Sequence, residues 1–216
     1  MNRKNIILFD LDGTITDSKQ GIAKSVQYAL SHYGIEEPDV RKLYKFIGPP
    51  LRVSFRDFYG FDAQKAEEVL TKYREYYKDK GIYENLLYDD IKRVISELYD
   101  AGKKLILATS KPRIFAVEIM RYFDLEKYFD FIGGSELNGQ RDDKAEVIRY
   151  VLEQTGISDL SSVVMVGDRK YDVLGAKEAG IDCVGVLYGF GDLKELTEAG
   201  ANCIVEKAGE LLDILI

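Results

Sequence analysis

Two aspartates, one residue apart, follow the first apolar run of the chain. Asp10 and Asp12 come after four consecutive apolar residues, 6–9, and Gly13 follows them. A continuous apolar run is typical of a parallel strand that helices cover on both faces. Residues i and i+2 of an extended chain point to the same side, so both carboxylates can face one pocket. Two carboxylates at such a short distance repel each other, and a hard divalent cation such as Mg²⁺ would relieve the repulsion.

A simpler interpretation of the same stretch needs no site. Asp-Gly is a common turn dipeptide, and Asp17-Ser18 could only cap the next helix. Asp10 and Asp12 would then mark nothing more than the end of a strand. The other strand ends of the chain are needed to choose between the two interpretations.

Two further apolar runs end in residues that suit a phosphate or a metal. Thr109 and Ser110 follow one run, and their hydroxyls and amides could bind a phosphate oxygen or merely cap a helix. Asp168 and Asp172 follow another, in the stretch Gly-Asp-Arg-Lys-Tyr-Asp. With Asp10 and the backbone carbonyl of Asp12, these two acids could complete an oxygen cage for Mg²⁺.

A positive charge is also expected near the two aspartates. Lys144 opens a predicted helix after a polar loop and could bridge a phosphoryl group and the nucleophile. Arg141 lies three residues earlier and could supply the charge in its place. Either side chain could instead be an ordinary solvated surface cation.

Strand and helix patterns alternate through most of the chain. This alternation predicts βαβ units, hence an α/β fold with a doubly wound parallel sheet. The predicted strands cover residues 6–9, 104–109, 129–132, 162–167, 183–187 and 203–205, and the predicted helices 90–100, 114–122, 144–154, 171–179, 193–199 and a terminal one. Between the first two strands, residues 16–85 carry helical patterns only, including a long one over 63–80. A helical domain, 16–85, is therefore expected inside a core domain formed by 1–15 and 86–216.

Bulk composition excludes several classes of protein. The 216 residues carry a formal net charge of −7, which argues against a nucleic-acid backbone or an anionic membrane as the main partner. No segment approaches the roughly 20 apolar residues of a membrane span, and the first residues do not resemble a signal peptide. We therefore expect a cytoplasmic protein. The lone histidine, His32, falls in a helical pattern where a surface position is expected, which disfavours histidine-based hydrolysis.

Taken together, the motifs resemble those of the haloacid dehalogenase-like superfamily. Asp-Leu-Asp-Gly-Thr at 10–14 is similar to its first motif, Thr109-Ser110 to its second, Lys144 to its third and Gly-Asp-Arg-Lys-Tyr-Asp to its fourth. The helical insertion resembles a C1 cap of the phosphoglycolate phosphatase and β-phosphoglucomutase branch, and the later sequence looks most like the 5′-nucleotidase-like group. The chain departs from many relatives at Asp89-Asp90, where they carry Pro-Gly.

The resemblance implies a mechanism and roles for residues. Asp10 would be the nucleophile, Asp12 the general acid/base, Thr109, Ser110 and Lys144 the phosphate ligands, and Asp10, Asp12, Asp168 and Asp172 the Mg²⁺ ligands. The expected activity is Mg²⁺-dependent hydrolysis of a small phosphate ester, with a 5′-nucleotide or phosphoglycolate as candidate substrates. The expected assembly is a monomer or homodimer. Lys45 and Arg52, in the helical insertion, are the candidate specificity residues.

Two alternatives remain open from the sequence. A phosphomutase of the β-phosphoglucomutase type would share all four motifs and pass the phosphoryl group to a sugar instead of water. A receiver domain is also doubly wound and also accepts phosphate on an aspartate. Receiver domains carry that aspartate on a later strand and lack a large helical insertion, so the order of motifs disfavours them.

Overall fold

The structure is a computed structural model that describes residues 4–216, and the chain forms two compact units. The core unit comprises the chain up to Thr16 together with Leu87–Ile216. The inserted unit is Asp17–Leu86. No helix among the described residues is both long enough and apolar enough to cross a membrane.

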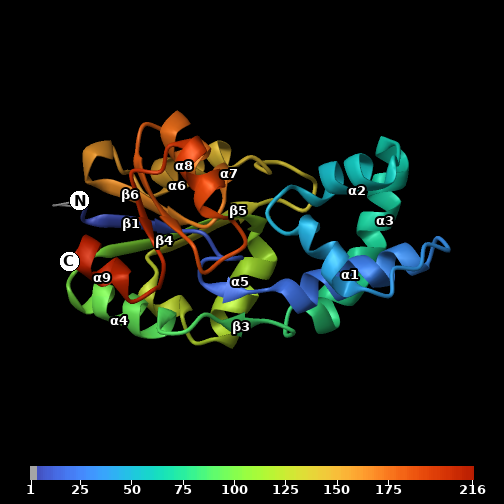
Figure 1. Ribbon diagram of the computed structural model, residues 1–216. Helices are drawn as coiled ribbons and strands as arrows, with labels where there is room; N and C mark the ends of the chain where they lie inside the picture. The colour runs from blue at the N-terminus through green and yellow to red at the C-terminus, as the bar shows by residue number, and fades with distance from the viewer. Residues whose placement is uncertain (1–3) are drawn as a thin grey trace. The chain divides into compact units, whose positions relative to one another are not determined.

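A six-stranded parallel sheet forms the centre of the core unit (Figure 1). Its order is β5-β4-β1-β6-β7-β8, so β1 lies inside the sheet and the chain winds away from it in both directions. The strands are β1 (Ile6–Phe9), β4 (Lys104–Pro112), β5 (Phe131–Ser135), β6 (Val163–Gly167), β7 (Asp182–Val186) and β8 (Cys203–Val205). The point where the winding reverses, beside β1, is where such sheets hold their ligands.

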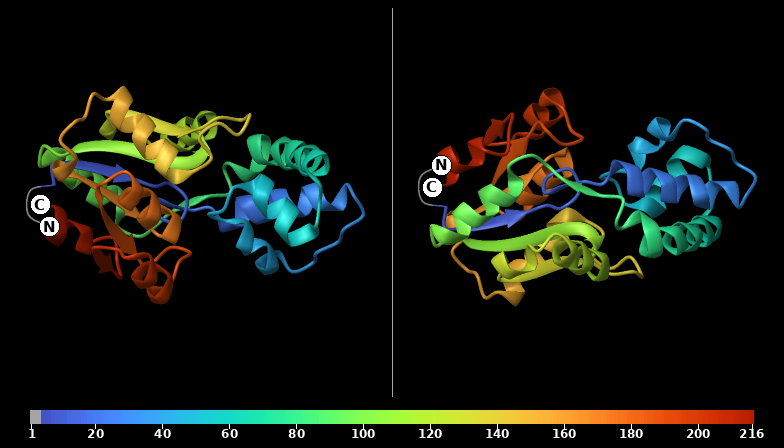
Figure 2. Two further views of the ribbon diagram at one scale, coloured as in Figure 1. Left: turned by 90° about the horizontal axis from the view of Figure 1, so that it is seen from above. Right: turned by 90° about the horizontal axis from the view of Figure 1, so that it is seen from below.

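Helices cover both faces of this sheet, as the views of Figures 1 and 2 show. One layer contains α4 (Ile91–Asp100), α5 (Arg113–Tyr122) and α9 (Glu210–Leu215). The other contains α6 (Lys144–Gln154), α7 (Lys170–Glu178) and α8 (Leu193–Ala199). Short 3₁₀ turns, Glu126–Tyr128 and Leu160–Ser162, precede β5 and β6. The predicted fold class, a doubly wound parallel α/β sheet, is confirmed.

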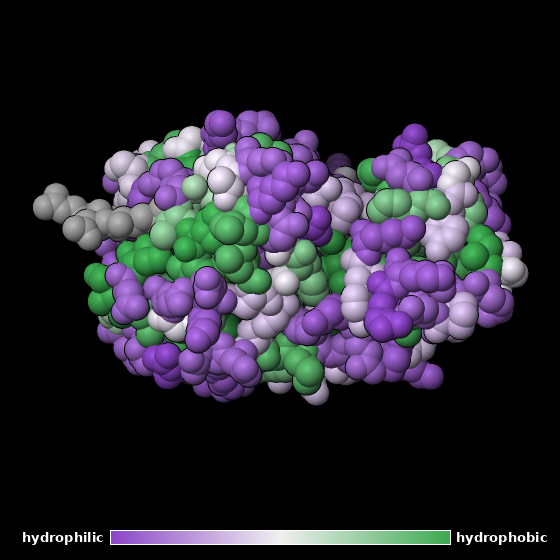
Figure 3. Space-filling view, in the orientation of Figure 1, coloured by the Kyte–Doolittle hydropathy of each residue, from purple (hydrophilic) through white to green (hydrophobic). Residues whose placement is uncertain are grey.

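Burial explains why the strands are continuous apolar runs. Leu8, Ile106 and Met165, on the three central strands, are fully buried in one cluster with residues of α6 and α7. The opposite face is buried as well, since Ile7 and Leu105 also have no exposed surface. On the face that Figure 3 shows, hydrophilic residues are widespread, and apolar residues gather on part of the core unit.

Two strands near the edge differ from their predicted bounds. β4 continues to Pro112 instead of ending at Thr109, with a register shift against β5 between those residues. β5 begins at Phe131 and includes Gly133 and Gly134, although glycine normally weakens a strand. A side chain at Gly133 would place its Cβ 2.1 Å from Val151 Cγ1, so the absence of a side chain lets α6 pack against β5.

The inserted unit is helical. It contains α1 (Lys19–Ser31), a 3₁₀ segment (Val40–Phe46), α2 (Leu51–Tyr59) and α3 (Ala63–Tyr76). The long helix predicted over 63–80 is α-helical only to Tyr76, because the chain then widens into a π turn, Tyr77–Gly81. That turn packs tightly on α1, since a Cβ at Gly21 would lie 2.0 Å from the Gly81 carbonyl oxygen.

The chain passes between the units through two short strands. β2 (Thr16–Asp17) and β3 (Leu86–Leu87) pair as a two-stranded sheet. Shortly after β3, Asp90 has φ 64°, a left-handed conformation that favours glycine. Aspartate tolerates this conformation better than most residues, so the tight entry to α4 survives where many relatives carry Pro-Gly.

Candidate active site

Asp10 is the first residue beyond β1, at the carboxyl edge of the sheet. Its backbone N–H donates to the Val166 carbonyl at 2.9 Å, which extends the pairing of β1 with β6 by one residue. Its side chain is largely buried, and Oδ1 lies 2.7 Å from Lys144 Nζ. The nucleophile candidate is therefore held by the sheet on one side and by a buried cation on the other.

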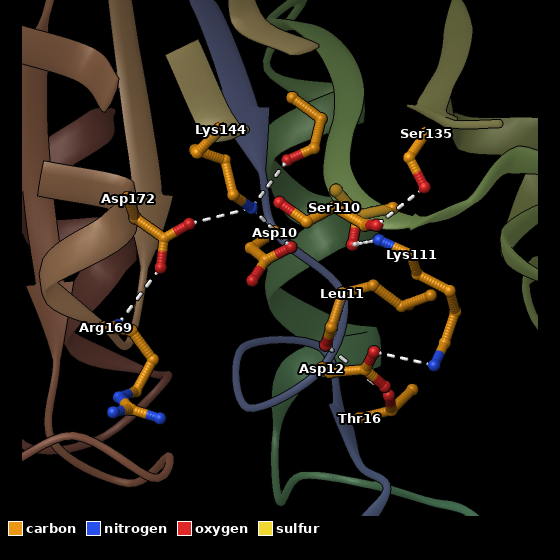
Figure 4. A network of polar contacts seen from close by, with 12 residues as sticks. Asp10, Leu11, Asp12, Thr16, Ser110, Lys111, Ser135, Lys144, Arg169 and Asp172 are labelled. Carbon is orange, nitrogen blue, oxygen red and sulfur yellow. Dashed lines mark hydrogen bonds and ion pairs between the residues drawn. The ribbon is translucent and has the colours of Figure 1, made fainter. Parts of the chain in front are cut away.

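Lys144 begins α6 and points its amino group among three oxygen atoms. Asp143 caps the helix by accepting from the N–H groups of Ala145 and Glu146. Lys144 Nζ lies 2.7 Å from Asp10 Oδ1 and 2.8 Å from Asp172 Oδ1, and it donates to the Ala108 carbonyl at 3.1 Å (Figure 4). Burial lowers the pKa of Lys144, but the two carboxylates outweigh burial and raise it above its ordinary value.

Asp168 and Asp172 lie at the junction of β6 and α7, and both are almost fully buried. Asp168 Oδ2 accepts from Phe190 N at 2.7 Å, and Asp172 Oδ2 accepts from Arg169 N at 3.0 Å. Burial, then the charges of Asp172 and Asp10, raise the pKa of Asp168 well above its ordinary value. Burial likewise raises the pKa of Asp172 to about 6, against the opposing charge of Lys144.

The three acids Asp10, Asp168 and Asp172 fit a divalent cation. Each offers an oxygen, and these oxygens all lie within 4.8 Å of one another. Asp168 Oδ1 is buried without a hydrogen-bond partner among the described residues. A donor set made only of carboxylate oxygens suits a hard ion such as Mg²⁺, which would also offset the mutual repulsion of the carboxylates.

Asp12 forms an ion pair with Lys111, a contact that the sequence did not predict. Lys111 Nζ lies 2.7 Å from Asp12 Oδ2, and the Lys111 side chain is only 6% exposed (Figure 4). Lys111 is part of β4 because that strand continues past Thr109. Ending the predicted strand at Thr109 left Lys111 in a loop. Residues 109–111 are all polar, so no alternation of apolar and polar residues signalled that the strand continues.

The remaining predicted phosphate ligands lie at the end of β4. Thr109 is almost fully buried, and its Oγ1 accepts from Lys111 N at 3.3 Å. The Ser110 carbonyl accepts from Ser135 Oγ at 2.8 Å. Neither residue caps α5 directly, because the strand runs on and the helix begins only at Arg113.

Arg141 does not share the position of Lys144. Its guanidinium forms an ion pair with Glu136 and lies 4.2 Å from the centroid of the Tyr150 ring. Of the two candidate cations, Lys144 and not Arg141 contacts Asp10. The expected surface position of His32 is also found, with the ring exposed and its Nδ1 2.9 Å from the Tyr28 carbonyl oxygen.

The two specificity candidates lie in the inserted unit. Arg52 is in the first turn of α2 and forms an ion pair with Glu67 of α3. Lys45 lies with its amino group 4.4 Å from the centroid of the Phe58 ring. Both side chains thus have partners within their own unit, and their role toward a substrate stays a prediction.

Known proteins resemble the chain along most of its length. A 5′-nucleotidase from Pseudomonas aeruginosa is 48% identical over 190 residues, 88% of this chain and 86% of that protein. Tyrosine-protein kinase PtkA from Mycobacterium tuberculosis is 39% identical over 204 residues, 94% of this chain and 69% of that protein.

A solved structure agrees in fold as well as in sequence. The crystal structure of a predicted phosphatase from Clostridium acetobutylicum is 46% identical, with a TM-score of 0.95 over 98% of this chain and 97% of that one. The family model of the haloacid dehalogenase-like hydrolases matches residues 7–186, from β1 through β7. The chain belongs to the haloacid dehalogenase-like hydrolase family.

Proposed function

We propose that this hydrolase is a Mg²⁺-dependent phosphatase of small phosphate monoesters that works through an aspartyl-phosphate. One observation carries the proposal. A buried lysine joins Asp10 to Asp172, while Asp168 completes a cluster of three carboxylates at the carboxyl edge of the sheet. Such a cluster is unstable alone and becomes useful when a cation and an anionic substrate enter it.

Asp10, Asp168 and Asp172 would hold the cation. The backbone carbonyl of Asp12 is the further ligand that the sequence suggested. When bound, Mg²⁺ supplies positive charge that lets an anionic carboxylate approach an anionic phosphate.

Asp10 and Asp12 divide the reaction between them. A carboxylate oxygen of Asp10 forms a bond to phosphorus while the bond from phosphorus to the ester oxygen breaks, and Asp12 gives its proton to that leaving oxygen. Water then forms a bond to the phosphorus of the aspartyl-phosphate while the bond from phosphorus to the Asp10 oxygen breaks, and the water gives a proton to Asp12. Inorganic phosphate leaves, and both aspartates return to their starting states.

Lys144 and the end of β4 would position the phosphoryl group. The amino group of Lys144 is fixed by three oxygens, so it can offset negative charge on Asp10 and the phosphate without reorganising. Thr109 and Ser110 would contribute a hydroxyl and a backbone amide to the phosphate oxygens. Lys111 would hold the Asp12 carboxylate in place through its ion pair.

For the substrate, we favour a nucleoside 5′-monophosphate, with phosphoglycolate as the alternative. The similarity to a 5′-nucleotidase over 88% of this chain supports the first. The inserted unit would act as a C1 cap that closes over the substrate, excludes water and contacts the leaving group. Lys45 and Arg52 would meet a second anionic or polar group of the substrate.

The similarity to PtkA favours a second candidate, phosphoryl transfer to a protein tyrosine. The same aspartyl-phosphate would serve that reaction and also a phosphomutase, since the three differ only in the acceptor. The receiver alternative loses support because Asp10 follows β1 and the chain is a member of a hydrolase family.

A screen of turnover tests the proposal. Nucleotides, sugar phosphates, phosphoglycolate and p-nitrophenyl phosphate are each mixed with the protein in Mg²⁺, and released phosphate is measured. We expect multiple turnovers, loss of activity in EDTA, recovery with Mg²⁺ and poor substitution by Ca²⁺. Full activity of verified metal-free protein would contradict the mechanism.

Reactions with different phosphoryl acceptors distinguish a phosphatase from a mutase, a kinase and a receiver. Activation by a sugar bisphosphate without phosphate release would indicate a mutase. Transfer of label from ATP to a tyrosine peptide would indicate a kinase, and a single turnover would indicate a receiver.

A further inference from the structure

A loop between β7 and α8 lies against the buried acid Asp168. This loop, residues 188–191, reads Tyr-Gly-Phe-Gly and belongs to neither the strand nor the helix. Its Phe190 N–H donates to Asp168 Oδ2 at 2.7 Å. One oxygen of this carboxylate is thereby occupied, and Oδ1 has no hydrogen-bond partner among the described residues.

The glycines of the loop allow backbone to lie directly on Asp168. A Cβ added at Gly189 would lie 2.4 Å from Asp168 Cβ and 2.3 Å from the Gly13 carbonyl oxygen. A Cβ added at Gly191 would lie 2.0 Å from the Asp168 carbonyl oxygen. Any side chain at these positions would push the loop away from the acid.

A second contact ties this loop to the turn that carries Asp12. Tyr188 donates its hydroxyl to the Thr14 carbonyl at 3.1 Å, and its ring lies 5.0 Å from that of Tyr88. Gly13, in the same turn, has φ 90°, and a Cβ there would lie 2.1 Å from Asp168 Oδ2. Asp168 is therefore enclosed between two loops that a tyrosine holds together.

We propose that the loop 188–191 positions Asp168 for the metal, so that it sets both the affinity and the selectivity of the site. The inference rests on the proposed Mg²⁺ site. Phe190 N restrains one oxygen of Asp168 and leaves Oδ1 without a hydrogen-bond partner among the described residues. Asp168 then presents a single oxygen to a cation, whereas Arg169 N and Lys144 Nζ each contact one oxygen of Asp172.

This restraint should discriminate between cations. Mg²⁺ is small and demands near-ideal octahedral geometry, whereas Ca²⁺ accepts more oxygens and often binds both oxygens of one carboxylate. A carboxylate that presents only one oxygen, as Asp168 does, favours Mg²⁺. Freeing Asp168 Oδ2 should therefore weaken Mg²⁺ binding more than Ca²⁺ binding.

The test is calorimetric titration of Mg²⁺ and of Ca²⁺ into metal-free full-length protein. Gly191→Ala should weaken Mg²⁺ binding by at least about 10-fold, as expected when a partner of a metal ligand is displaced. Ca²⁺ binding should weaken less, so the ratio of the two affinities falls. Gly209→Ala is the matched control, because Gly209, the residue before α9, has φ −57° and a Cβ there meets nothing closer than 3.3 Å.

A milder variant covers the case in which Gly191→Ala does not fold. Tyr188→Phe removes only the hydroxyl that holds the two loops together, and it should weaken Mg²⁺ binding by a few-fold with the same fall in the ratio. Unchanged Mg²⁺ affinity in a folded variant, or equal weakening of both ions, would overturn the inference. Wild-type protein that binds no Mg²⁺ would instead overturn the proposed function.

Discussion

The two aspartates of the first turn differ in how each is paired with a lysine. Lys144 reaches Asp10 from the start of a helix and also contacts Asp172 and the Ala108 carbonyl. Lys111 reaches Asp12 from the end of a strand, and the two pairs are similarly buried, with lysine side chains 4% and 6% exposed and aspartate side chains 12% and 15% exposed. The first lysine joins two acids of the three-carboxylate cluster, whereas the second pairs with an acid outside that cluster.

The two lysines should therefore contribute differently, Lys144 to the stability of the fold and Lys111 to the orientation of Asp12. Removing the cation of a buried cluster leaves several carboxylates that repel each other, which costs stability as well as activity. Removing the cation beside Asp12 leaves a single carboxylate outside that cluster, so the loss of stability should be smaller. Substitutions at Lys144 and Lys111 should therefore fail in different ways, although both lysines contact an aspartate of the same turn.

The largest expected effect separates the roles of the aspartates themselves. Asp10→Asn should form no phosphoenzyme, because an amide cannot attack phosphorus productively. Asp12→Asn should accumulate it from p-nitrophenyl phosphate, whose leaving group needs little protonation, since the water that cleaves the intermediate has lost its base. Mass spectrometry of acid-quenched protein would show a phosphate adduct on Asp12→Asn alone. The reverse pattern would exchange the two roles, and an adduct on neither would leave Asp12 without support.

Lys144→Met should abolish turnover and also destabilise the fold. Breaking a buried ion pair typically costs about 3–5 kcal/mol. In a protein of this size, that loss corresponds to a fall in Tm of roughly 10 °C. Calorimetry in metal-free buffer measures it, with Lys194→Met as the control, since the Lys194 side chain is 81% exposed. Equal Tm values for the two variants would show that the cluster does not depend on its lysine.

Lys111→Met should lower activity and lower Tm less than Lys144→Met does. If the ion pair orients Asp12, kcat/KM for an alkyl phosphate, which reports formation of the phosphoenzyme, should fall about 10-fold, a small part of the roughly 10²–10⁴-fold that acid–base catalysis contributes. The kcat/KM for p-nitrophenyl phosphate should fall much less, because its leaving group needs little protonation. A parallel loss on both substrates would mean that Lys111 acts on the phosphate and not on Asp12.

Asp168→Asn should raise the Tm of the metal-free protein by a few degrees at about pH 8. The folded-state pKa of Asp168 is raised above its unfolded value, so the folded protein binds the extra proton and loses stability as pH rises past the unfolded pKa. The gain from asparagine should therefore be largest at high pH and shrink as pH falls toward about 4, near the unfolded pKa of an aspartate. Thermal melts in EDTA across this range measure it. A gain that grows with acidity would contradict the raised pKa.

The smallest expected effect concerns cations outside the core unit. Arg52→Ala should raise KM for the preferred substrate by roughly 5-fold while KM for p-nitrophenyl phosphate changes little, as expected for lost uniform binding. Arg56→Ala, an exposed arginine in the same helix, is the control. Equal effects of Arg52→Ala on both substrates would make this arginine structural.

Sequence patterns predicted the sheet because the signals that define it are local. Buried parallel strands are continuous apolar runs, and polar residues at their carboxyl ends must share one edge. Asp10 and Asp168 come directly after such runs and Asp172 lies in the first turn of the next helix, which was enough to predict that the three acids lie together. Lys144 was predicted on the motif order, and it contacts two of those acids.

Other features depend on contacts that sequence patterns do not show. β4 continues past Thr109 because β5 pairs with it as far as Pro112, and that continuation brings Lys111 to Asp12. Gly133 is favoured inside β5 by the neighbouring Val151 side chain, not by any strand preference. The glycines at 189 and 191 are explained only by their distance to Asp168.

The pairing of β2 with β3 bears on how the family's chains can change in evolution. Thr16 and Leu87 lie on neighbouring strands, so the point where the chain leaves the core unit is adjacent to the point where it returns. A segment whose own ends meet can be lengthened, shortened or exchanged at little entropic cost, because loop closure rises only slowly with length. Residues 17–86 thus form a segment whose length can change at little entropic cost to the core chain.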